Sequence, residues 1–180
     1  MPPADPMIEE VPASLVADPL AWFIAHHRRH RQLCRLIEDL AAEAVFDPTR
    51  IRLVLDYLKT EAPLHLLDEE EDLFPMLRAR CADMDDVNPV LLQLLAEHRT
   101  DGAEAAEILG RLERCLAVAA APGGIPETRD ALTQYAAHER QHLALENAVI
   151  LPIARLRLTE EDLHQLSARL GHRRAQVGKS

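Results

Sequence analysis

One element of sequence occurs twice in this chain, and it limits the fold more than any other feature. In each copy, a histidine is followed by a glutamate four residues later and by a proline ten residues later. Two apolar residues directly precede the proline. The copies begin at His65 and His142, and their glutamates are Glu69 and Glu146. Residues four apart share one face of an α-helix, one turn from each other. The repeat therefore predicts two helices that each present an imidazole and a carboxylate to the same neighbour.

Each copy is preceded by a second helical segment with a histidine of its own. Aligning residues 24–28 with residues 95–99 pairs His27 with His98. Both histidines lie on the apolar stripe of their segment, with His30, one turn further along, as the alternative to His27. The chain therefore consists of two helical hairpins. Each hairpin offers one histidine from its first helix and a histidine with a glutamate from its second.

Helix-start signals divide the rest of the chain. Asp18-Pro19, Asp47-Pro48 and Asn88-Pro89 are typical of an N-cap followed by proline in the first helical turn. Long helices are predicted over residues 19–44, 48–80, 88–120 and 126–157, and a capping box at Thr159 predicts a short fifth helix over 160–172.

The short connections between these helices favour antiparallel neighbours. The predicted fold is all-α, an up-down antiparallel four-helix bundle over residues 18–157. An irregular N-terminal arm is expected over residues 1–17, and a short C-terminal helix with a tail over residues 158–180.

Composition argues against several classes of function. The net charge of −10 disfavours a nucleic-acid surface, and no apolar run is long enough to cross a membrane. The first residues lack the basic start and apolar stretch of an export signal. Cys34, Cys81 and Cys115 lie far apart without a metal-binding or redox spacing, as is typical of a reducing compartment. We therefore expect a cytoplasmic protein.

Burial of the repeated residues requires compensating charge. A carboxylate without a partner costs on the order of several kcal/mol to bury. Two divalent cations would supply that charge and fix the imidazoles as neutral ligands. Imidazole and carboxylate donors without cysteine suit iron or manganese better than a structural zinc site. The sequence thus predicts a two-metal site for iron or manganese, with zinc as a substitute, on His27, His65, Glu69, His98, His142 and Glu146.

These residues, in this order, resemble the hemerythrin-like family of cation-binding domains. The resemblance covers about residues 19–157 and includes the Leu-Phe-Pro that follows the first His-to-Glu motif. It implies a non-haem di-iron centre inside a four-helix bundle. Glu69 and Glu146 would bridge the irons, and the four histidines would take terminal positions. Family members bind oxygen reversibly, sense oxygen, nitric oxide or iron, store iron, or process peroxide.

Three positions depart from the oxygen-carrying members of that family. Gly102 stands where the carrier has a second histidine, one turn after His98. Glu146 lies four residues after His142, whereas the carrier uses an aspartate one residue later. His138, one turn before His142, is a further candidate metal ligand or a hydrogen-bond donor to one. These departures weaken the expectation of oxygen carriage and leave the expectation of metal binding intact.

Residues around the motifs carry secondary predictions. The acidic run Glu70, Glu71 and Asp72 is predicted to form a solvated face, with one member available to orient a ligand histidine. Tyr57 and Tyr135 are expected in the core, with their hydroxyls near the site.

The leading functional hypothesis is a binding protein rather than an enzyme. Its di-iron site would bind oxygen or a related molecule, nitric oxide or peroxide, for sensing, scavenging or iron storage. The alternatives are a di-iron oxidase or peroxidase and a metal-gated regulatory interaction module. A homodimer or an unidentified protein partner is compatible with each of these.

Overall fold

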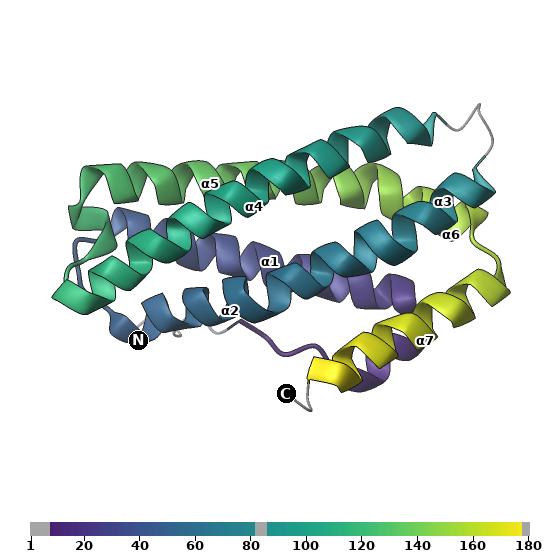
Figure 1. Ribbon diagram of the computed structural model, residues 1–180, viewed down its shortest axis with the longest axis horizontal. Helices are drawn as coiled ribbons and strands as arrows, with labels where there is room; N and C mark the ends of the chain where they lie inside the picture. The colour runs from purple at the N-terminus through teal and green to yellow at the C-terminus, as the bar shows by residue number, and fades with distance from the viewer. Residues whose placement is uncertain (1–7, 82–85, 178–180) are drawn as a thin grey trace, which may run out of the picture.

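A computed structural model gives the structure of residues 8–81 and 86–177, in which all regular structure is helical (Figure 1). The bundle consists of α1 (Pro19–Ala42), α2 (Pro48–Leu67), α4 (Val87–Val118) and α5 (Pro126–Leu145). Helix α1 packs against α2 and α5, and α4 packs against the same two helices. The predicted all-α four-helix bundle is confirmed.

The second helix of each hairpin contains a π-helical segment, which the sequence analysis did not predict. Helix α2 continues through η2 (Asp68–Leu73) into α3 (Phe74–Arg80), and α5 continues through η5 (Glu146–Ile150) into α6 (Leu151–Arg157).

These π turns explain the constant distance between motif and proline. The backbone N–H of Phe74 donates to the carbonyl of Glu69, five residues earlier, and Leu151 donates to Glu146 in the same way. The proline follows directly in both cases. Because a proline ring clashes with the carbonyl four residues before it in a regular helix, the wider turn accommodates it.

Side-chain caps hold several helix starts where the sequence predicts them. Asp18 accepts the backbone N–H of Ala21, and Asp47 likewise caps α2. Thr159 and Asp162 satisfy each other's backbone N–H groups in the predicted capping box.

Helix α4, the third of the four long helices predicted, is bounded differently from its prediction of 88–120. It begins at Val87, so Asn88 lies in its first turn rather than at its N-cap. It ends at Val118, and its C-cap residue Ala119 has a left-handed φ of 52°. The connection to α5 then passes close to the end of α1, where a Cβ on Gly123 would lie 2.4 Å from the carbonyl oxygen of Glu43. Only glycine permits that approach.

The segments before α1 and after α6 pack against each other. The arm predicted over residues 1–17 contains a 3-10 helix, η1 (Ala13–Ala17). Helix α7 (Glu160–Val177) is longer than the predicted 160–172, and it packs on η1, α1 and η2 (Figure 1). Residues 1–7 and 178–180 of the predicted arm and tail lie outside the described residues.

Two apolar clusters fill the bundle, and a polar layer separates them. One cluster includes Leu33, Ile37, Ile51, Leu58, Leu112 and Leu132. The other includes Phe23, Phe74, Leu77, Leu91, Ile150 and Leu166. Along each of the four helices, the buried histidines and carboxylates lie between a segment of one cluster and a segment of the other.

Candidate metal centre

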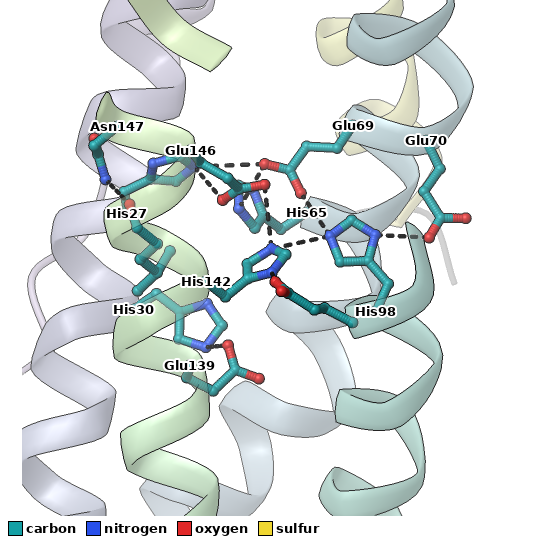
Figure 2. A network of polar contacts seen from close by, with 12 residues as sticks. His27, His30, His65, Glu69, Glu70, His98, Glu139, His142, Glu146 and Asn147 are labelled. Carbon is teal, nitrogen blue, oxygen red and sulfur yellow. Dashed lines mark hydrogen bonds and ion pairs between the residues drawn. The ribbon is translucent and has the colours of Figure 1, made fainter. Parts of the chain in front are cut away.

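All six residues of the predicted metal site meet in this polar layer. Figure 2 shows their nitrogen and oxygen atoms turned toward one another. The four histidines come one from each bundle helix, and the glutamates lie at the start of the two π segments, Glu69 as the second residue of η2 and Glu146 as the first of η5. None of the six is more than 6% exposed. The six side chains selected by their spacing therefore all lie on the inward faces of their helices.

The donor atoms of these residues form two groups of four that share both glutamates. One group is His27, His65, Glu69 and Glu146, and the other is Glu69, His98, His142 and Glu146. Within each group, one donor atom per residue lies within 4.8 Å of the others. Each group could hold one metal ion, and the shared carboxylates could bridge two ions.

The polar atoms of the first group are poorly satisfied by the protein alone. Neither ring nitrogen of His27 or His65 has a hydrogen-bond partner among the described residues. Burial, together with the neighbouring Glu146, raises the pKa of Glu69 well above its usual value. Two buried carboxyls side by side require a proton or a cation. His27 Nε2 lies 3.5 Å from both glutamates, and His65 Nε2 lies 3.3 Å from Glu69. Imidazoles and carboxylates that face one another in this way, without hydrogen bonds to His27 or His65, fit a pair of divalent cations.

A proton can partly take the place of a cation in the second group. Burial lowers the pKa of His142, but its contacts with Glu146 and Glu97 outweigh that effect and raise the pKa to about 9. Burial disfavours ionised Glu146, yet the same contact with His142 holds its pKa at about 2. The His142 Nε2–H faces Glu146 at 3.2 Å and His98 Nε2 at 3.0 Å. Metal binding would displace that proton.

Two further carboxylates support the histidines of the second group. The Nδ1 atom of His98 lies 2.7 Å from Glu70 (Figure 2). The Nδ1 atom of His142 lies 2.9 Å from Glu97. A carboxylate behind an imidazole fixes its tautomer and raises its basicity as a ligand. Glu70 is thus the member of the acidic run that orients a histidine, while Glu97 was not anticipated, although it directly precedes His98.

The structure does not bring His138 to the cluster. Its ring pairs with Glu104 of α4 at 3.0 Å, and its side chain is 41% exposed. The next residue, Glu139, points inward instead and lies 3.0 Å from Nε2 of His30. His30 is therefore buried beside the cluster but belongs to neither group of donors. Residues 138 and 139 both fit an inward stripe by spacing, so sequence alone could not separate them.

Comparison with known families bears on this arrangement directly. A family model described as the hemerythrin HHE cation binding domain matches residues 18–154. The chain belongs to this family. Comparison with curated proteins finds none that matches the chain. Family membership, together with the two donor groups, indicates a cation-binding bundle. No helix in the described ranges combines the length and apolar character needed to cross a membrane.

A cavity of about 200 Å³ lies against the second donor group of this hemerythrin-family domain. Glu69, His98 and His142 line it, as does His65 of the first group. Its lining also includes Pro63 and Gly102, which are exposed between α2 and α4. A Cβ on Gly102 would meet nothing within 4 Å. Where the oxygen carriers have a histidine, this chain therefore leaves open space beside the cluster.

The acidic run behind Glu69 is less solvated than predicted. Asp68 is fully buried and pairs with Arg173 and Arg174 of α7. Asp72 is 3% exposed and also pairs with Arg173, at 2.8 Å. Helix α7 therefore covers the π turn that carries Glu69. These arginines lie about a hundred residues further along the chain, so no local pattern could reveal the pairing.

Proposed function

We propose that this centre holds two iron ions and binds oxygen or a related small molecule, nitric oxide or peroxide, for sensing, scavenging or iron storage. The observation that carries the proposal is the pair of four-residue donor groups that share Glu69 and Glu146. Nitrogen and oxygen donors without sulfur favour iron or manganese, with zinc as a weaker substitute.

The protein's own residues have distinct roles in this proposal. His27 and His65 would be the terminal ligands of one ion, and His98 and His142 those of the other. Four protein donors per ion are fewer than the six that octahedral iron accepts, so an iron pair would supply open coordination positions and redox chemistry. The cavity beside His98 and His142 would admit the small molecule.

The proposal can be tested on protein loaded anaerobically with Fe(II) and then exposed to air or nitric oxide. Wild-type protein should retain two irons per chain and develop a new visible or near-ultraviolet absorption band. His98→Ala should lose the band and at least one iron. His138→Ala is the matched control, because that residue lies outside both donor groups, and it should behave as wild type. Full metal content in His98→Ala would contradict the assignment.

A second candidate function, a di-iron oxidase or peroxidase, is favoured by the acid–base groups in the cavity. His30, Asp101, Tyr135 and Glu139 line it together with the donor residues, and such groups can exchange protons with a bound molecule. Multiple turnovers with peroxide and an added reductant would identify an enzyme, whereas stoichiometric reversible binding would identify a carrier or sensor. Glu139→Gln should slow turnover without changing metal content if the enzyme alternative is right.

A further inference from the structure

A groove between α4 and α5 reaches the metal centre from outside. Its volume is about 520 Å³, and its lining includes Gln93, Glu97, Thr100, Asp101, His138 and His142. His142 belongs to the second donor group. The groove therefore connects solvent with one of the candidate ligands.

Asp101 is the unusual residue in this lining. It is 8% exposed, and it borders both the groove and the inner cavity. Its carboxylate has no hydrogen bond or ion pair within residues 8–81 and 86–177. Burial and the nearby Glu139 raise the pKa of Asp101 to about 7, as expected for a carboxylate that lacks a partner. A carboxylate in this position can contact a cation in the groove without first breaking a bond to another residue of the protein.

The remaining lining of the groove is also suited to cations. Glu97 is 34% exposed at its side chain and lies against His142. Glu104, which pairs with His138 at the same face, adds a further carboxylate. The net charge of −10 draws cations toward the protein as a whole.

The other opening to the cluster has the opposite character. Between α2 and α4 the inner cavity is lined by Ala62, Pro63, Gly102, Ala105 and Ala106. A neutral diatomic molecule passes such a surface freely, whereas a hydrated cation would lose water there without compensation. The groove between α4 and α5 therefore favours cations, and the opening between α2 and α4 favours neutral small molecules.

We propose that the groove between α4 and α5 is the route by which divalent cations reach the centre, and that Asp101 is the carboxylate that passes them inward. The inference depends on the proposed metal binding. Asp101 lies outside both four-residue groups, so it acts as a positioning residue in transit rather than as a resident ligand. It should change how fast ions arrive and leave, and not how many are held.

The test uses the metal-free full chain and Co(II), whose absorption reports binding. Association is followed by stopped-flow mixing, dissociation by transfer to an excess of chelator, and stoichiometry by titration. Asp101→Asn should slow association and dissociation alike, each on the order of tenfold, and leave two ions bound with unchanged affinity. The wild-type association rate should also fall with added salt, and the variant rate should fall less.

Two other variants complete the design. Asp130→Asn is the matched control, because that aspartate is 70% exposed on α5 and lies outside the groove, and it should keep wild-type rates. Gln141→Lys places a positive charge in the exposed lining of the groove and should slow association even if Asp101→Asn folds poorly.

Each contrary outcome has a separate meaning. Wild-type rates in both Asp101→Asn and Gln141→Lys would overturn the route. Loss of an ion from Asp101→Asn would make Asp101 a ligand and also overturn it. Absence of Co(II) binding by the wild-type chain would instead contradict the proposed function.

Discussion

The two halves of the metal centre differ in what lies behind their histidines. In the α4–α5 half, the outer nitrogens of His98 and His142 face the carboxylates of Glu70 and Glu97. In the α1–α2 half, aromatic rings surround the histidines instead. Phe23 lies 6.0 Å from the ring of His65, measured between centroids.

This difference can be traced to two pairs of equivalent positions in the internal repeat. The residue after the shared glutamate is Glu70 in the first hairpin and Asn147 in the second. The residue before the first-helix histidine is Glu97 in the second hairpin and His26 in the first. Asn147 donates to the carbonyl of Leu143, and His26 stacks on His65 with an interplanar angle of 11°. Both carboxylates therefore support the same half.

The two donor groups therefore offer unequal surroundings to a pair of cations. A carboxylate behind an imidazole strengthens it as a ligand. Among the six candidate ligands, the outer groove is lined by His142 only, whereas the inner cavity touches His65 as well as His98 and His142. We expect the α4–α5 ion to be the better-supported and more accessible of the two. The α1–α2 ion would be enclosed by apolar packing around His27, which is fully buried.

Loss of a shared glutamate should have the largest effect, because it removes a donor atom from both halves of the centre at once. Glu69→Gln takes one donor from both groups and should abolish stable binding of both ions, measured by metal content after gel filtration. Glu71→Gln, two residues further along and 62% exposed at its side chain, should retain both. Retention of one tightly bound ion in Glu69→Gln would show that the carboxylate serves a single metal.

Loss of a supporting carboxylate should weaken only one half. Glu70→Asn, which copies the residue of the second hairpin, should reduce the affinity for one ion about 10- to 100-fold. Chelator-competition titration with Co(II) measures the two affinities separately. Glu104→Gln is the control, since it contacts His138 outside the centre. An equal loss at both ions would contradict the assignment of Glu70 to His98 alone.

The reciprocal substitution should strengthen the weaker half by a smaller factor. Asn147→Asp places a carboxylate at the position equivalent to Glu70, and we expect the α1–α2 ion to bind up to about tenfold more tightly. The gain is limited because His27 is enclosed and a new buried charge is costly there. The same titration checks it, and a decrease in affinity would show that desolvation dominates.

The smallest effect should come from Gly102. A Cβ at this helical position meets no atom within 4 Å, so Gly102→Ala should raise the free energy of unfolding of the metal-free chain by about 0.5–1 kcal/mol. Urea denaturation measures the change, with metal content expected to stay constant. A destabilised variant would mean that the open space beside the cluster is needed by the fold.

Much of the site could be predicted because its information is local. The His-to-Glu spacing puts both side chains of a motif on one helical face whatever surrounds the helix. The Asp-Pro pairs determine where α1 and α2 begin. The repeated proline follows a π turn whose hydrogen bond is accepted by the carbonyl of each shared glutamate. The family match follows from the same local patterns.

Choices between neighbouring residues could not be predicted in this way. Adjacent positions differ by about 100° around a helix, and both His138 and Glu139 lie near the inward edge of α5. The difference arises across helices, since Glu139 meets His30 of α1 while His138 meets Glu104 of α4. Such pairings depend on helix rotation and packing, which no single segment encodes.

The sequence by itself determined the helices, the doubled motif and the six converging side chains, because these follow from backbone periodicity and from the cost of burying charge. The tertiary structure alone decided which carboxylates stand behind which histidines, how α7 covers Asp68, and where Asp101 lies between groove and cavity. Those features join residues distant in the chain, and only packing brings them into contact.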